Sequence, residues 1–200
     1  MKNISYLLFL FAFSACIPAE DSTYPEEVTL PTPPPIEENR RNICDFDLSE
    51  KEGEYELAGK WEFAGFQDIQ TGKMDNLTCL ARIADFALSG EDYDNLFKVI
   101  LNLSQVGGHC NETVSFEAIS FGSHFQGCYQ ADGEFITFVI SESDIRSIPS
   151  SASTTFPVQG FEIRFLEDLR TARNFQIAKN KLYLYGEKEE ERIVFVALDE

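Results

Sequence analysis

The feature that most constrains the fold is a series of short segments in which apolar and polar residues alternate, separated by polar or glycine-containing turns. The first segment covers residues 55–66 and places on one side Tyr55, Leu57, Gly59, Trp61, Phe63 and Gly65. Further apolar or alternating runs cover residues 96–103, 114–121, 133–140, 175–177, 182–185 and 193–196. A period of two is typical of half-buried β-strands. The last three runs, joined by short turns, predict an antiparallel meander.

One segment has helical periodicity instead. Between Pro157 and Asn174, apolar side chains recur at i, i+4, i+5, i+8 and i+11, namely Phe161, Phe165, Leu166, Leu169 and Ala172. This spacing predicts one amphipathic helix over residues 161–172. The polar stretch 141–159, which contains two prolines, predicts a loop.

Residues 79–88 fit either class of element. A helical face there would consist of Leu80, Ile83, Ala84 and Ala87, but the stretch is too short to decide. Taken together, the segments predict an α+β fold, a mostly antiparallel curled β-sheet or barrel-like structure with one amphipathic helix.

Composition limits the classes of partner. The 200 residues include 34 Asp and Glu against 16 Lys and Arg, which gives a formal net charge of −18. Nucleic acids are bound through clustered Lys and Arg, so this balance excludes a nucleic-acid partner. The chain also has 18 Phe and is 44% hydrophobic, which predicts a folded domain with a core built on phenylalanine.

The N-terminus has the pattern of a secretory signal. Lys2 precedes an apolar run at residues 6–13, which is followed by Ser14, Ala15 and Cys16. The run is about half the roughly 20 residues that a spanning helix needs. Small residues before a cysteine resemble the lipobox of bacterial lipoproteins, which implies that residues 1–15 are a lipoprotein signal peptide and that Cys16 is lipidated. The alternative is an ordinary cleaved signal with an incidental cysteine.

The segment after the signal differs in composition from the rest of the chain. Residues 16–43 hold six of the eight prolines and carry a net charge of −4, and show almost no apolar periodicity. Such a stretch tends towards extended polyproline II and predicts a tether that holds the domain off a membrane. Its run of three prolines, 33–35, could instead be a ligand for a proline-reading domain. Residues 44–200 then form one domain with a net charge of −15.

Four cysteines remain after Cys16, namely Cys44, Cys79, Cys110 and Cys128. An even number in an oxidising compartment predicts two disulfides. Three pairings are possible, of which local closure favours Cys44–Cys79 with Cys110–Cys128. The rival interpretation is a metal site that uses His109 and His124, but the spacings of zinc sites are absent, so we predict no metal and no cofactor.

Several motifs resemble the META/HslJ family of small β-rich domains in bacterial envelope proteins. Leu57-x-Gly59-x-Trp61 is similar to the first strand of the family. Residues 122–138 resemble its central G-C-N-x-F-x-G-x-Y hairpin, with matches at Gly122, Phe125, Gly127, Tyr129 and Gly133 and with Ser123-His124 in place of Cys-Asn. A second G-x-C-N occurs at residues 108–111. Residues 161–172 and the pattern Phe175-x-Ile177…Leu182-x-Leu184 resemble the closing helix and hairpin.

The resemblance implies that residues 44–200 form a META/HslJ-like domain, one sheet curled around a helix. It brings no catalytic residues with it. A lipocalin-like barrel is the runner-up, because Gly59-x-Trp61 also opens the first strand of that fold and an interior cavity there holds a small apolar ligand.

Motifs for catalysis are sparse. The chain has two histidines and lacks the G-x-S-x-G, P-loop and dinucleotide-binding patterns. Cysteine–histidine pairs drawn from Cys110 and His109, or Cys128 and His124, would lose their thiols to disulfides. Asp92-x-Asp94-Asn95 lacks the glycine and final glutamate of a calcium loop, and the four glutamates among residues 187–191 are expected to form a solvated turn.

These observations predict a non-enzymatic lipoprotein of the cell envelope. The N-terminal lipid is expected to anchor the protein in the membrane, and the domain is expected to bind an envelope protein or polymer. Ile17 after Cys16 resembles the outer-membrane variant of lipoprotein sorting. This pattern does not decide whether the domain faces the periplasm or the cell exterior. The alternative function is a lipocalin-like carrier of a small apolar ligand.

Overall fold

The computed structural model describes residues 44, 46–89, 99–105, 110, 114–149 and 151–198. The chain divides into two units, Met1–Ile36 and Glu37–Glu200, and every described residue belongs to the second. Outside the described residues lie the predicted signal peptide, Cys16, residues 17–43, Asp92-x-Asp94-Asn95 and His109.

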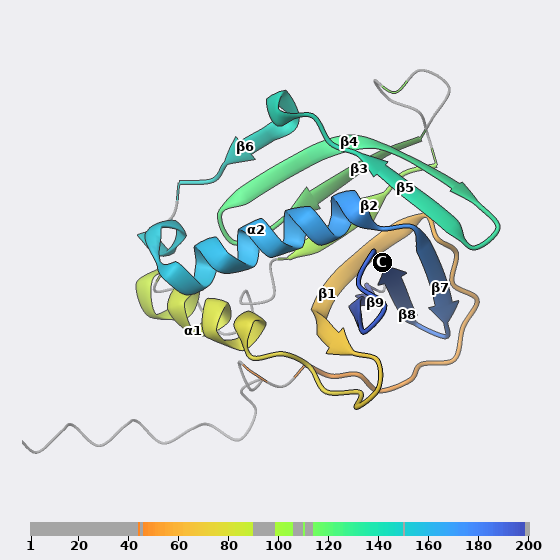
Figure 1. Ribbon diagram of the computed structural model, residues 1–200, viewed down its shortest axis with the longest axis horizontal. Helices are drawn as coiled ribbons and strands as arrows, with labels where there is room; N and C mark the ends of the chain where they lie inside the picture. Colours follow the sequence, from red (N-terminus) through yellow and green to blue (C-terminus); the bar gives the residue numbers. More distant parts are fainter. Residues whose placement is uncertain are drawn as a thin grey trace, which may run out of the picture. The chain divides into compact units, whose positions relative to one another are not determined.

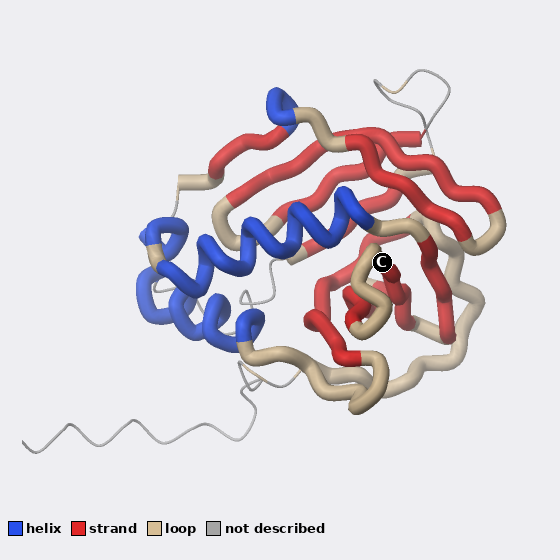
Figure 2. The backbone as a smooth tube through the Cα atoms, in the orientation of Figure 1, coloured by secondary structure: helices blue, strands red, loops and turns tan. Residues whose placement is uncertain are grey.

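Nine strands of the described residues form a single antiparallel sheet that closes on itself (Figures 1 and 2). The order is β3-β2-β1-β9-β8-β7-β5-β4, and β3 also pairs with β4, which completes an eight-stranded barrel. The ninth strand, β6, pairs with one end of β4. The strands are β1 (Gly59–Asp68), β2 (Ile100–Leu103), β3 (Val114–Ile119), β4 (Ser123–Asp132), β5 (Phe135–Val139), β6 (Ile145–Ser147), β7 (Asn174–Ala178), β8 (Lys181–Tyr185) and β9 (Glu191–Ala197). The predicted α+β, barrel-like antiparallel fold is therefore confirmed.

The prediction of one amphipathic helix is not confirmed, because the described residues form two α-helices, α1 (Leu77–Ser89) and α2 (Phe156–Thr171). The predicted helix corresponds to α2, which begins at Phe156, five residues before the predicted start. Pro157 lies in its first turn, where a residue without a backbone N–H is tolerated. The predicted loop before it also contains two 3-10 turns, η2 (Glu142–Asp144) and η3 (Ser151–Thr154), and the short strand β6.

Helix α1 buries a different face from the one that its apolar residues indicate. Leu80 is 50% exposed and Ile83 is 44% exposed, whereas Ala81, Arg82 and Asp85 are buried. The helix packs along α2 and against η3 (Figure 1). The small side chain of Ala81 allows a close approach to the core.

The barrel interior is filled by phenylalanine side chains from the sheet and from α2. Phe63 of β1 makes edge-to-face contacts with Phe161 and Phe165 of α2 at centroid distances of 5.3 and 5.4 Å, and with Phe195 of β9 at 5.6 Å. All four side chains are fully buried. Each such pair contributes about 0.5–1.5 kcal/mol beyond the area that it buries. The predicted phenylalanine core is present, and it includes the helix.

A β-bulge in β1 changes the face on which its aromatic residues lie. Phe63 pairs with Phe195, but the next paired residue is Gly65, opposite Val194, so Ala64 is an extra residue. The shift brings Phe66 to the interior with Phe63, in place of the Gly65 that strict alternation predicts. The predicted alternation therefore holds for Trp61 and Phe63 and fails beyond the bulge.

Residues that precede β1 cover part of the outside of the barrel. Ala64, Val194 and Val196 face outward from β1 and β9 and are packed under a second apolar cluster that includes Phe46 and Leu48. The turn between β7 and β8 holds this segment in place. The buried Asn180 donates to the carbonyl of Ser49 at 3.2 Å and accepts from the backbone N–H of Lys51 at 3.1 Å, and Lys179 forms ion pairs with Glu50 and Glu52.

Both disulfides are present, in the pairing that local closure favours. Cys44 is joined to Cys79 in the first turn of α1, with 4.7 Å between their Cα atoms. Cys110 is joined to Cys128 of β4, with 5.7 Å between Cα atoms. The first disulfide fixes the start of the domain to α1, and the second fixes residue 110 against the barrel.

Gly127 has a structural reason for being glycine. It lies on β4 opposite Phe116 of β3. A Cβ atom at this position would lie 2.7 Å from Cε1 of Phe116 and would also collide with the backbone oxygen of Val139. The absence of a side chain therefore lets the Phe116 ring cover β4 and stack edge-to-face on Phe138.

We predict that Gly127→Ala lowers the free energy of unfolding by about 1–3 kcal/mol or more, because backbone atoms of β5 cannot move aside without breaking the sheet. Urea titration followed by circular dichroism measures the change. The matched control is Gly160→Ala in α2, where the new Cβ meets Leu77 at an ordinary 3.6 Å. That variant is expected to be neutral or to gain about 0.5–1 kcal/mol. Equal stability of the two variants would contradict the packing argument.

We also predict that the double variant Cys44→Ser, Cys79→Ser loses about 3–4 kcal/mol of stability, because its 35-residue loop is no longer closed in the unfolded chain. Denaturation of the two proteins without reductant measures the loss. Thiol titration of the folded parent provides the control, since none of Cys44, Cys79, Cys110 and Cys128 should react. Reaction of all four would show that neither disulfide forms.

Candidate functional site

The outward side chains of β2, β3, β4 and β5 form a mostly polar surface, which also exposes the apolar Ile119 and Val139. Pairing places Asn102 opposite Glu117, and Glu117 opposite Gln126, so that the three lie in one row across β2, β3 and β4. Further along β4, Gln130 pairs with Thr137 and Asp132 pairs with Phe135. We call this surface the β2–β5 face and define it by Asn102, Glu117, Gln126, Gln130, Thr137 and Phe135.

One end of the β2–β5 face is hollowed over its polar row. The hollow has a volume of about 180 Å³, and Asn102, Ser104, Ser115, Glu117 and Gln126 are among the residues that line it. Oε1 of Glu117 lies 2.5 Å from Nε2 of His124 on the neighbouring strand. That contact holds the carboxylate on the sheet surface, in one row with the amides of Asn102 and Gln126.

A larger hollow, of about 500 Å³, lies at the other end of the β2–β5 face. It is lined by side chains that face outward and also by Tyr129 and Ile136, which face the barrel interior and are buried. It therefore reaches the rim of the barrel. Phe135 stands at this rim with 67% of its surface exposed, close to the carboxylate of its pairing partner Asp132.

The Cys110–Cys128 disulfide lies between the two hollows. Cys128 faces outward on β4 between Gln126 of the first hollow and Gln130 of the second. The sulfur of Cys110 lies 3.6 Å from the carbonyl oxygen of Gly127. Residue 110 is thus fixed against the middle of the β2–β5 face.

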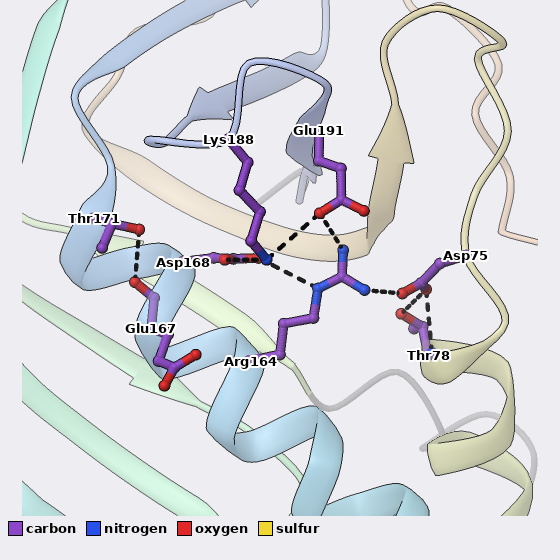
Figure 3. Close-up of polar contacts among 8 residues, drawn as sticks. All are labelled: Asp75, Thr78, Arg164, Glu167, Asp168, Thr171, Lys188 and Glu191. Carbon is purple, nitrogen blue, oxygen red and sulfur yellow. Dashed lines mark hydrogen bonds and ion pairs between the residues drawn. The ribbon is translucent and has the colours of Figure 1, made fainter.

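A second group of polar side chains joins the two helices to the β8–β9 turn (Figure 3). Arg164 of α2 forms ion pairs with Asp75, which precedes α1, with Asp168 one turn along α2, and with Glu191 at the start of β9. Its guanidinium carbon lies 3.9 Å from the ring centre of Phe66. Asp75 also accepts from the N–H and hydroxyl of Thr78, which positions the first turn of α1.

Lys188 extends this network from the turn. It lies 3.7 Å from Asp168 and 3.6 Å from Glu191. Burial raises the pKa of Asp168, although the positive charges of Lys188 and Arg164 act in the opposite direction. The neighbouring hollow has a volume of about 20 Å³, which is room for a single water molecule. The geometry is that of a structural clamp between elements.

Glu162 has the other perturbed carboxyl of α2. Burial raises its pKa, while hydrogen bonds from Ser120 and Gly122 act to lower it. The Ser120 hydroxyl donates to it at 2.5 Å and the Gly122 N–H at 3.0 Å. Both carboxylate oxygens are therefore engaged in holding the β3–β4 turn against α2.

The structure separates the chemistry-bearing residues that the sequence brings to notice. His124 lies on the β2–β5 face with Glu117, and the sulfurs of Cys110 and Cys128 are joined to each other. Glu187 and Glu191, from the glutamate-rich turn, form ion pairs with Arg173 and Arg164. Among the described residues there is no group of three or more His, Cys, Asp or Glu that could hold a metal ion. The described helices include none long and apolar enough to span a membrane.

Sequence reasoning missed the residues that define the β2–β5 face. The motif comparison places a hairpin at residues 122–138, but periodicity alone does not identify β4, because Gly127 interrupts its inward apolar series of Phe125 and Tyr129. The available signal is the alternation of Gln126, Cys128 and Gln130 with those inward positions. The sequence around Arg164 does not indicate its ion pairs, because Asp75 and Glu191 come from distant parts of the chain.

No family model matches the chain, and no curated protein matches it. Among solved structures, a DUF4847 family protein from Bacteroides vulgatus is similar over 72% of this chain and 94% of its own, with 18% sequence identity and a TM-score of 0.47.

We predict that Arg164→Met lowers the free energy of unfolding by about 1–3 kcal/mol, because Asp75, Asp168 and Glu191 lose a shared, largely buried cation. Thermal and urea denaturation measure the loss. The control is Arg173→Met, whose pair with Glu187 is exposed and is worth less than about 1 kcal/mol. Equal effects of the two substitutions would mean that the Arg164 network does not clamp the helices.

Proposed function

We propose that the chain is a lipid-anchored lipoprotein of the cell envelope whose barrel domain is a non-enzymatic binding module. The observation that carries the binding role is the difference between two parts of the outer surface. Apolar residues of β1 and β9 are covered by Phe46 and Leu48. The β2–β5 face instead presents amide, hydroxyl and carboxyl groups over two hollows.

The state of the described cysteines and of the two α2 carboxyls with raised pKa supports a non-enzymatic role. The described cysteine sulfurs are in disulfides. Glu162 and Asp168 have raised pKa values, as a general acid would, but Glu162 is hydrogen-bonded to the β3–β4 turn and Asp168 belongs to the Arg164 network. Neither carboxyl lines the hollows of the β2–β5 face.

The filled interior argues against the carrier of an apolar ligand. A lipocalin-like carrier needs a cavity inside the barrel. Here Phe63, Phe161, Phe165 and Phe195 occupy that space and are fully buried. A ligand of this domain is therefore expected on its outer surface, where the two larger hollows lie.

The proposed anchor is the lipid on Cys16, with residues 17–43 as the spacer. Two structural features fit this arrangement, namely the disulfide that fixes Cys44 to α1 and the bonds from Asn180 that hold residues 49–51. Together they provide a firm point at which a tether could pull without unravelling β1. The META/HslJ-like character of residues 44–200 and the outer-membrane location are part of the same proposal, and its partner is an envelope protein or polymer.

We predict that Cys16→Ala abolishes lipidation and releases the protein from the membrane fraction, because an apolar run of this length does not anchor a chain once it is cleaved. Fractionation of cells and incorporation of labelled fatty acid measure the two effects. Ser22→Ala, in the tether, serves as the control and should remain lipidated and membrane-bound. Unchanged membrane association of the Cys16→Ala protein would refute the lipoprotein proposal.

A further inference from the structure

We propose that the β2–β5 face binds a neutral saccharide chain, with the Phe135 ring as the stacking platform and the amides of Asn102, Gln126 and Gln130 as the main hydrogen-bonding groups. The inference rests on the proposed function, because it names the ligand class of the same binding module. It is carried by the kinds of side chain on the face, their spacing, their charge and the pairing of the strands beneath them.

The polar groups of the face match a ligand rich in hydroxyls. A side-chain amide presents both donors and an acceptor, and a serine or threonine hydroxyl does both at one atom. Sugar hydroxyls need the same combination. Asn102 and Gln126 flank Glu117 in one row that lines the smaller hollow, and Gln130 and Thr137 line the larger one.

Phe135 supplies the apolar contact that a saccharide also requires. One face of a pyranose ring exposes C–H groups that pack on an aromatic ring, which buries apolar area without desolvating hydroxyls. Phe135 is 67% exposed on the rim of the larger hollow. The carboxylate of Asp132, directly opposite, is placed to accept hydrogen bonds from hydroxyls at the edge of a stacked ring.

The size of the face fits a chain better than a single sugar. Gln126 and Asp132 are six residues apart on β4, which corresponds to about 20 Å at a rise of about 3.4 Å per residue. The two hollows lie on either side of Cys128 along this line. A ligand that fills both must be extended and must pass the Cys110–Cys128 disulfide between them.

Charge disfavours an anionic ligand. The described residues that line the two hollows include Glu117 and Asp132 and no Lys or Arg. The whole chain carries a net charge of −18. An anionic polymer would meet repulsion from the face and from the protein as a whole, whereas a neutral one would not.

Strand pairing disfavours an extended peptide. Peptides commonly add to an exposed strand edge through main-chain hydrogen bonds. Here β2 pairs with β1 and β3, β3 with β2 and β4, and β4 with β3 and β5, so each of these three strands has a partner on both sides, whereas β5 pairs with β7 at Phe135 alone. Over β2, β3 and β4 the face therefore offers side chains to a ligand.

The test is affinity electrophoresis of the full-length lipoprotein in detergent, on native gels that contain an α-glucan, a β-glucan, a mannan or a xylan. At least one of these neutral polysaccharides is expected to retard the protein. Phe135→Ala should weaken that retardation at least tenfold, and Gln126→Ala several-fold. The matched control is Phe156→Ala on α2, which removes a ring that is 86% exposed and lies outside the face, and should change nothing. Melting curves show whether each variant is folded.

Three results would overturn the inference. They are no retardation by any neutral polysaccharide, equal effects of Phe135→Ala and Phe156→Ala, and retardation by anionic polygalacturonate in preference to the neutral polymers. Capture of peptides from a displayed library, lost in Phe135→Ala and without saccharide binding, would reassign the face to a protein partner. Failure of the anchor is distinguishable, because Cys16→Ala protein that stays in the membrane fraction but is still retarded would contradict the lipoprotein proposal and leave the saccharide inference standing.

Discussion

The insertion of Phe161 and Phe165 into the barrel is the contact on which the rest of the structure depends. The two rings of α2 meet Phe63 of β1 edge-to-face, and Phe165 also reaches Phe125 of β4. These contacts fix the rotation of α2 about its axis. Once that rotation is set, Glu162 faces the β3–β4 turn and Arg164 faces Asp75 and Glu191, so that one helix secures three separate connections.

A filled interior moves function to the outside of the barrel. The outer surface is then divided by what covers it, because residues 46–48 lie over β1 and β9 whereas the outward side chains of β2–β5 stay partly accessible. The two disulfides follow the same division. Cys44–Cys79 secures the covering segment to α1, and Cys110–Cys128 lies on the β2–β5 face. The attachment of the preceding chain and the proposed ligand surface thus involve different elements.

Elements that depend on local pattern could be predicted from the sequence, and elements that depend on a distant partner could not. The meander of β7, β8 and β9 and the apolar stripe of α2 have complete periodic signals, and both are present. The signal of β4 is incomplete, because Gly127 stands at an inward position to make room for the ring of Phe116 on β3. The β2–β5 face could not be assembled without the register of four strands, and the Arg164 network joins residues up to 89 positions apart.

The orientation of α1 follows from the bulge in β1, which is why hydrophobicity gives the wrong face. At the bulge the carbonyl of Phe63 accepts a hydrogen bond of 3.0 Å from Nη2 of the buried Arg82. A buried backbone carbonyl without a partner costs about 1–3 kcal/mol, comparable with the gain from burying one leucine side chain. The Arg82 guanidinium also lies 5.4 Å from the ring centre of Phe46, two residues after the cysteine that is bonded to α1. With Arg82 turned inward, the Phe63 carbonyl at the bulge has a hydrogen-bond donor and the Phe46 ring has a cation beside it. The same orientation of α1 leaves Leu80 and Ile83 exposed.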